Sequence, residues 1–225
     1  MDKYFTKTNY QNGDIISMLI TDLYNKNKNI IFIRTPTTGV WLDKLLVDKP
    51  NIIRILYDTN KIKKYKVSKS TKIIKSNNLE KKLDSLNKKY DLICIDPFHE
   101  YEYSKRDFFL LSSYLSDDGI IISHDCFPSN NNSALPKYIL GNWSGETYIA
   151  LVEFSYANPD LFYGILNIDT GIGIISKKNI LFLKNCMNVS KQKHLLDLHN
   201  NKSNDVYDFF SQNAIDIINL FVPGN

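Results

Sequence analysis

Two apolar segments that end in acidic and histidine side chains constrain the fold of this chain more than any other feature. Residues 90–96 form an apolar run that ends at a carboxylate, and residues 119–123 form a second run followed by an imidazole and a carboxylate. The chain between them has the length of one crossover helix, so the two strands are expected to run parallel and to lie side by side. One edge of one sheet then carries four polar side chains: Asp96, His99, His124 and Asp125. In open α/β sheets this carboxyl edge is where ligands bind.

Strand and helix patterns alternate along the chain. The expected strands are 29–33, 52–57, 72–75, 90–96 and 119–123, and then a tight hairpin of 162–168 and 172–175. The expected helices are 15–23, 41–46, 79–86 and 108–115, one that begins near Ser144, and a C-terminal helical part. This order predicts an α/β fold: a three-layer Rossmann-like sheet, mostly parallel, with a terminal antiparallel hairpin.

The length of 225 residues and the hydrophobic content of 43% fit one domain with a sizeable core. We expect a single domain over 1–225, with a helical lead-in at 1–28, an α/β core at 29–177 and a helical extension at 178–225. The formal charge is only +4. The densest basic stretch, 61–66, has no nucleic-acid motif around it, so a solvated loop is expected there and no nucleic-acid partner.

The cysteine spacing and the hydropathy of the sequence predict the cellular compartment of the protein. The three cysteines are far apart and form no CxxC pair, which is typical of a reducing compartment. No apolar run reaches the length of a membrane span, and the N-terminus has no apolar signal region. The sequence therefore predicts a soluble, cytoplasmic protein without a membrane span.

Four motifs together resemble a known family. They are Ile-Asp-Pro-Phe-His-Glu-Tyr-Glu at 95–102, His-Asp at 124–125, Asn-Trp-Ser-Gly-Glu at 142–146 and Asp-Thr-Gly-Ile-Gly at 169–173. In order and spacing they resemble the class I S-adenosylmethionine-dependent methyltransferases, and within these the small-molecule and sugar O-methyltransferases. The similarity covers about residues 29–177 and implies a sheet of five parallel strands followed by a hairpin.

The resemblance also implies a cofactor site for S-adenosylmethionine. Its expected residues follow the ends of the strands: Thr35, Gly39, Asp58 at the ribose, Ser76 and Asn77 near the adenine, and Asp96. The family normally has an acidic residue and a Gly-x-Gly turn after its first strand. This chain has Arg34, Pro36 and a single glycine, Gly39, in that segment. Glycines there let the backbone approach the ligand closely.

Methyl transfer to a hydroxyl needs alignment and a deprotonated nucleophile. By resemblance, His99 is the base, and the catalytic set is His99, Asp96 and His124. Asp96 and Asp125 could hold Mg²⁺, which prefers oxygen ligands. With His124 as a third ligand, the site could prefer Mn²⁺, Fe²⁺ or Zn²⁺, or bind no metal; alternatively His124 could orient against Asp125 as a second base.

The sequence thus predicts an S-adenosylmethionine-dependent O-methyltransferase that acts on a small molecule, a sugar or glycoconjugate precursor. Two other functions stay open. The altered segment 34–39 is compatible with a methyltransferase-like protein without catalysis, acting as a binding or partner subunit. The Asp and His cluster could also serve metal-dependent hydrolysis on the same scaffold. The expected partner is a small-molecule acceptor, and the sequence allows a homo-oligomer.

Overall fold

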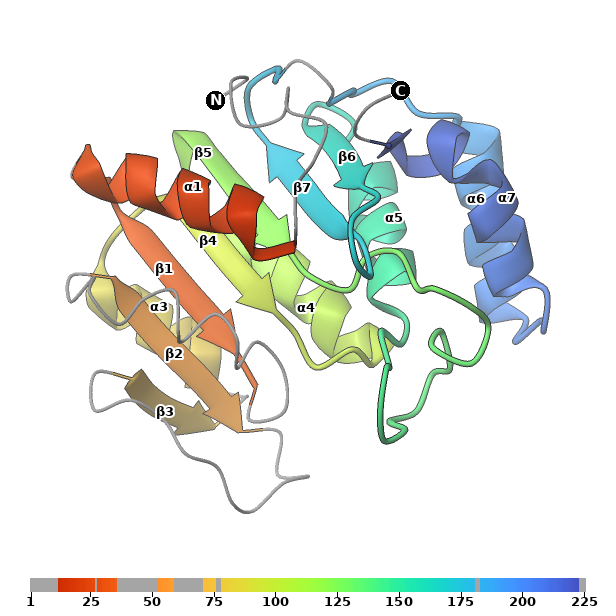
Figure 1. The fold of residues 1–225 in the computed structure, drawn as a ribbon, viewed down its shortest axis with the longest axis horizontal. Coiled ribbons are helices and arrows are strands. Elements are labelled where there is room, and N and C mark those ends of the chain that lie inside the picture. The colour runs from red at the N-terminus through yellow and green to blue at the C-terminus, as the bar shows by residue number, and fades with distance from the viewer. Residues whose placement is uncertain are drawn as a thin grey trace.

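The computed structural model describes residues 12–26, 28–35, 52–58, 71–75, 78–180 and 183–222. Its centre is an eight-stranded sheet in the order β3-β2-β1-β4-β5-β7-β6-β8 (Figure 1). The strands are β1 (Ile30–Arg34), β2 (Ile53–Asp58), β3 (Thr71–Lys75), β4 (Tyr90–Asp96), β5 (Leu115–Ser123), β6 (Phe162–Leu166), β7 (Ile172–Ser176) and β8 (Leu220–Phe221). The helices are α1 (Asn12–Asn25), α3 (Leu79–Leu86), α4 (Tyr101–Ser112), α5 (Thr147–Ala157), α6 (Val189–Asn200) and α7 (Val206–Ile218).

The sheet is mostly parallel, as the sequence predicts. Strands β1 to β5 pair in parallel, and β7 runs antiparallel to both β5 and β6. The short strand β8 pairs in parallel with β6 and was not predicted. From β1 the strand order runs outward in both directions, to β2 and β3 on one side and to β4 and β5 on the other. Open α/β sheets bind ligands at such a switch point, here between β1 and β4.

Two hydrophobic layers hold the helices against the sheet. Successive side chains of a strand point to opposite faces. In β1, Ile31 and Ile33 pack in the layer that contains residues of α3, α4 and α5, whereas Ile30 and Phe32 pack with Leu23 of α1. Figure 1 shows α1 on one face of the sheet and α3, α4 and α5 on the other. Because both faces are covered, the mid-sheet parts of the central strands are apolar runs, as at residues 92–95 of β4 and 120–122 of β5.

Two predicted element boundaries are wrong for local reasons. Leu115 was expected at the end of a helix, but it begins β5 and pairs with Tyr90 across a register shift. The helix expected near Ser144 begins at Thr147. Ser144 does not cap it, because its hydroxyl donates to the Asp125 carboxylate at 2.8 Å. The helix expected at 41–46 lies outside the described residues.

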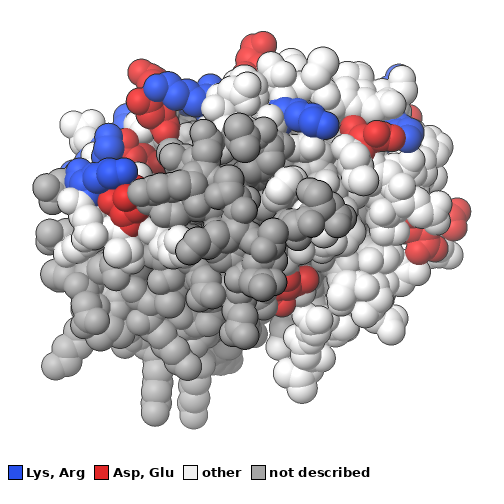
Figure 2. Space-filling view, turned by 45° about the horizontal axis from the view of Figure 1, so that its top comes forward, with Lys and Arg blue, Asp and Glu red and all other residues white. Residues whose placement is uncertain are grey.

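The described surface is mixed in charge. Figure 2 shows lysine or arginine and acidic side chains close to one another on this face of the molecule. Ion pairs such as Lys177–Asp117 and Lys191–Asp216 are part of this pattern. Within the described ranges, no helix combines the length and apolar character needed to cross a bilayer.

Candidate active site

The ends of β4 and β5 bring the predicted polar residues together. The two strands are adjacent and parallel, with Ile95 opposite Ser123. Asp96 is the last residue of β4, and the backbone N–H of His124 donates to the Ile95 carbonyl at 3.1 Å. The structure thus places four side chains in contact at one edge, and we call them the edge cluster: Asp96, His99, His124 and Asp125.

Asp125 occupies an unusual backbone position. Its φ of 58° lies in the left-handed region, which non-glycine residues rarely adopt but which Asp tolerates. The turn aims its carboxylate back toward β4. There it is 7% exposed, with Ser144 donating to Oδ1. Burial alone would raise the pKa of Asp125, but the charge of His99 and the hydrogen bond and charge of His124 lower it below its ordinary value.

His99 is held on both sides of its ring. Its Nδ1 lies 2.8 Å from the Trp143 carbonyl oxygen, which can only accept, so Nδ1 carries a proton. Its Nε2 lies 3.0 Å from Asp96 Oδ1 and 3.2 Å from Asp125 Oδ2. A lone pair facing two carboxylates would be repelled, so Nε2 is protonated as well. Burial alone would lower the pKa of His99, but Asp125 and Asp96 raise it above its ordinary value.

His124 is the more accessible imidazole, with 13% of its side chain exposed. Its Nδ1 lies 3.0 Å from Asp125 Oδ2 and 3.8 Å from Asp96 Oδ2, and its Nε2 lies 3.3 Å from Asp169 Oδ2. Burial alone would lower the pKa of His124, but the hydrogen bonds to Asp125 and Asp169 and the charge of Asp96 raise it. Without a bound metal, both imidazoles are therefore cationic, and with Asp169 the three carboxylates leave one negative charge in excess. A cation bound at a ring nitrogen of His124 would displace the proton there.

The edge cluster fits a divalent cation. One ligand atom each from Asp96, His124 and Asp125 lies within 4.8 Å of the others. The 3.0 Å between His124 Nδ1 and Asp125 Oδ2 is close to the ~3 Å that separates neighbouring ligands around an ion with bonds of about 2.0–2.1 Å. Two carboxylates and one imidazole suit Mn²⁺ as well as Mg²⁺.

The partners around these three ligands are also in place. His124 Nε2 faces Asp169, which is the carboxylate–imidazole pairing that orients metal-bound histidines. Ser144 contacts Oδ1 of Asp125 and His99 contacts Oδ2, so both contacts fix the orientation of a carboxylate that could bind a cation. We note that Asp169 belongs to the 169–173 motif, but no local pattern links it to His124.

Gly145 and Trp143 form a wall of the site whose role the sequence did not reveal. Gly145 has a φ of +56°, and a Cβ there would collide with the His99 carbonyl oxygen. The Trp143 ring packs against the His99 ring at 5.2 Å, and its Nε1 donates to the Leu135 carbonyl at 2.7 Å. Only the motif at 142–146 signalled this segment.

The predicted cofactor residues are described only in part. Thr35 follows β1 and is fully buried, and the preceding residue, Arg34, is buried opposite Asp96 in the register of β1 and β4. Asp58 ends β2, where its backbone is described. Gly39, Ser76 and Asn77 lie outside the described residues. Of the expected cofactor residues, Asp96 is the one that also belongs to the edge cluster.

Comparison with known proteins agrees with this fold. Residues 39–126 match the family model of a methyltransferase domain. A Staphylococcus aureus protein proposed to be a caffeoyl-CoA O-methyltransferase is 20% identical, with a TM-score of 0.50 over 73% of this chain and 82% of that chain. A SAH-bound methyltransferase from Podospora anserina is also 20% identical, with a TM-score of 0.47 over 74% of this chain and 79% of that one. No curated protein matches the chain. The predicted Rossmann-like architecture is confirmed.

Proposed function

We propose that this chain, of which residues 39–126 match the model of a methyltransferase domain, transfers a methyl group from S-adenosylmethionine to a hydroxyl of a small molecule. The observation that carries the proposal is the edge cluster, in which two buried carboxylates meet two imidazoles at the carboxyl edge of the sheet. It lies beside β1 and β4, where the strand order reverses and open α/β sheets bind their ligands. The acceptor that we propose is a sugar or a glycoconjugate precursor, in keeping with the resemblance of residues 95–102.

Methyl transfer needs no general acid for the leaving group, because the sulfonium of the cofactor leaves as a neutral thioether. The protein has to align the hydroxyl with the methyl group and to accept its proton, and alignment alone can supply about 7–11 kcal/mol at most. A divalent cation held by Asp96, His124 and Asp125 would supply Lewis-acid polarisation of the hydroxyl. The proton of the polarised hydroxyl would then pass to solvent, because the Asp96 and Asp125 carboxylates are already committed to the imidazoles and to the cation.

The base role expected for His99 becomes a positioning role in this proposal. Both of its ring nitrogens donate, to Trp143 on one side and to the two carboxylates on the other. A ring committed in this way has no lone pair for a substrate proton. Its cationic charge instead holds Asp96 and Asp125 side by side, which like-charged groups would otherwise resist.

Calorimetric titration with S-adenosylmethionine tests the first requirement. Micromolar binding supports the transferase. Silence at millimolar cofactor favours the non-catalytic alternative, which the buried Arg34 at the end of β1 supports. Transfer of a labelled methyl group to a panel of hexoses and hexose disaccharides tests the second requirement. Loss of that transfer after chelation, with recovery on addition of Mn²⁺ or Mg²⁺, tests the metal.

A further inference from the structure

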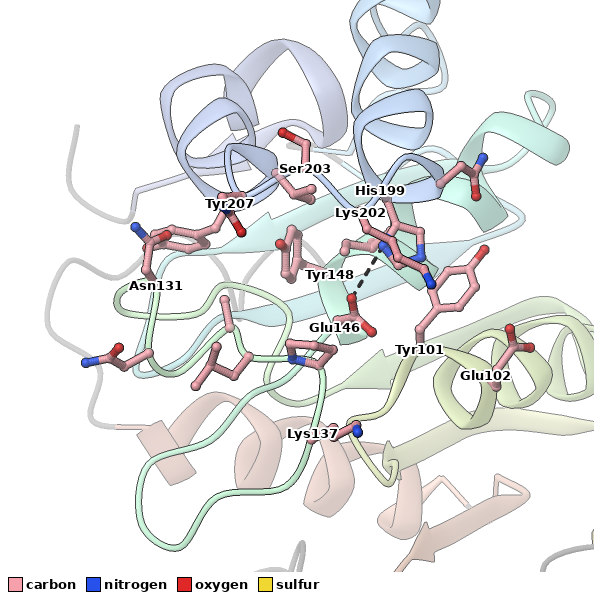
Figure 3. Close-up of a pocket in the computed structure, with 18 residues that line it drawn as sticks. Tyr101, Glu102, Asn131, Lys137, Glu146, Tyr148, His199, Lys202, Ser203 and Tyr207 are labelled. Atoms are coloured by element: carbon pink, nitrogen blue, oxygen red, sulfur yellow. Dashed lines mark ion pairs between the residues drawn. The ribbon is translucent and has the colours of Figure 1, made fainter.

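A separate cavity of about 800 Å³ lies beside the edge cluster. It is lined by the start of α4, the start of α5, residues 131–137 and the turn between α6 and α7, and it is open to solvent on one side (Figure 3). None of the four edge-cluster residues lines it. The volume falls in the range of small-molecule sites, which are about 300–1,000 Å³. The mechanism above uses no residue whose side chain faces this space.

Tyr148 presents its hydroxyl to the cavity. The residue is only 1% exposed, but its hydroxyl oxygen is not one of the fully buried unpaired atoms, and among the described residues no group forms a hydrogen bond with it. A hydroxyl that lines a cavity without a protein partner is available to a ligand in place of water. Burial and the charge of nearby Glu146 raise the pKa of Tyr148, so the hydroxyl is a neutral donor and acceptor.

Glu146 lines the same cavity, and one of its carboxylate oxygens is uncommitted. Its Oε1 lies 3.4 Å from His199 Nδ1, as drawn in Figure 3. Its other oxygen has no hydrogen bond or ion pair within the described part of the chain. A carboxylate oxygen and a phenol hydroxyl, both directed at one space, can bind two hydroxyl groups of one ligand.

The other two tyrosines of the cavity are already fixed. The Tyr101 hydroxyl donates to Glu153, and the Tyr207 hydroxyl donates to the Pro128 carbonyl at 2.7 Å. Their hydroxyl protons are therefore already used, and among these three tyrosines Tyr148 alone has a hydroxyl proton that no described residue accepts. Aromatic rings beside apolar walls suit the C–H face of a sugar ring.

The remaining lining favours a neutral polar ligand. Two lysines, Lys137 and Lys202, are matched by two acids, Glu102 and Glu146, so there is no cationic excess to select a phosphate. The amides and hydroxyls that could bind sugar hydroxyls are Asn131, Asn132, Asn200, Asn204 and Ser203.

We propose that this cavity binds a neutral hexose unit of the acceptor, next to the unit that is methylated. This assignment rests on the proposed transferase function. Glu146 ties the two places together, because its backbone N–H donates to the His99 carbonyl at 2.8 Å while its carboxylate faces the cavity. The acceptor is then a glycoside with at least two units, one at the edge cluster and one in the cavity.

Saturation-transfer NMR on the full chain without cofactor tests the cavity directly. The probes are glucose, galactose, mannose and N-acetylglucosamine at millimolar concentration. We expect at least one to bind. Tyr148→Phe should weaken that hexose about five- to tenfold, because it loses a hydrogen bond, and Glu146→Gln about tenfold, because it loses the charge that strengthens one. Tyr156→Phe, on the exposed side of the same helix, is the matched control and should not change binding.

Tyr148→Phe removes a hydroxyl that has no partner among the described residues, so its thermal unfolding midpoint should not fall. Wild-type protein that binds none of the four hexoses, or Tyr148→Phe that binds as tightly as wild type, would overturn the assignment. If a hexose binds through Tyr148 but S-adenosylmethionine does not bind, the transferase proposal fails and the hexose site stands. If the cofactor binds and the hexoses do not, the hexose site alone fails.

Discussion

The edge cluster and the cavity lie on either side of one segment, residues 143–146. They differ in whether their polar side chains have partners within the protein. In the edge cluster every carboxylate and imidazole is in contact with another charged group. In the cavity, Tyr148 and one oxygen of Glu146 have no polar partner among the described residues. A ligand for the edge cluster must therefore compete with existing contacts, whereas a ligand for the cavity completes missing ones.

The two regions also differ in net charge, and this difference indicates the ligand of each. The edge cluster with Asp169 has an excess of one carboxylate over its imidazolium partners, which favours a cation. The cavity has equal numbers of lysines and acids, which favours a neutral ligand. Charge pairs at low exposure are expensive to break, because an unpaired buried charge costs about 3–5 kcal/mol. Substitutions in the edge cluster should therefore have the larger effects.

The largest effect is expected from Asp125→Asn on metal binding. The substitution keeps the shape but removes one carboxylate ligand, so Mn²⁺ affinity should fall by more than about a hundredfold. Calorimetric titration with Mn²⁺ measures this without an acceptor. Asp118→Asn is the control, since Asp118 lies on the exposed part of β5 and pairs with Lys178. Equal Mn²⁺ affinity in wild type and Asp125→Asn would contradict a metal site in the edge cluster.

His99 offers the second test, because a base and a positioning residue respond differently to a conservative change. His99→Ala should lower methyl transfer about a hundredfold, with S-adenosylmethionine affinity within about twofold of wild type. His99→Gln keeps an N–H that can donate to the carboxylates but cannot take up a proton. It should retain about ten times more activity than the alanine variant.

Measurement of labelled methyl transfer and of cofactor binding on both variants separates these roles. Equal loss in the two variants would restore His99 as the base. Wild-type turnover in His99→Ala would exclude any role for the ring.

The fold could be predicted from sequence because its signals are local. The apolar runs of β4 and β5 end at polar residues, and α3 matches its predicted bounds of 79–86. The juxtaposition of Asp96 with Asp125 follows from the order of the strands alone. These properties depend on periodicity and chain connectivity, which the sequence shows directly.

The protonation of His99 and the cavity could not be predicted, because each depends on contacts between distant residues. The partner that fixes the His99 proton is a backbone carbonyl at Trp143, and a carbonyl leaves no mark in the sequence. The cavity forms where residues 131–137 meet the turn between α6 and α7. The pairing of β8 with β6 likewise joins segments far apart in the chain.

Gly145 tests whether the segment shared by the two regions is rigid. Gly145→Ala should lower the free energy of unfolding by about 2 kcal/mol, since its Cβ would meet the His99 carbonyl and its φ is positive. Urea unfolding measures this. Gly141→Ala is the matched control: its φ is also positive, but nothing lies within 4 Å of the added Cβ. A larger loss at Gly141 than at Gly145 would show that backbone strain, and not the contact with His99, sets the cost.

Ser144→Ala is expected to have the smallest effect and to show whether the two regions act independently. Its hydroxyl donates to Asp125 and does not line the cavity. Loss of one hydrogen bond to a charged group costs about 1.5–3 kcal/mol at a buried site and less where a water can replace it. Methyl transfer should therefore fall about fivefold to tenfold, with hexose binding in the cavity unchanged.

Ser211→Ala is the control for that measurement, because the Ser211 hydroxyl donates to the Asp208 carbonyl on the exposed side of α7, away from both regions. Ser144 and Glu146 are separated by one glycine, yet one faces the edge cluster and the other the cavity. A change at Ser144 that weakens hexose binding as strongly as Glu146→Gln would mean that the segment moves as one body. The edge cluster and the cavity would then be two ends of a single site.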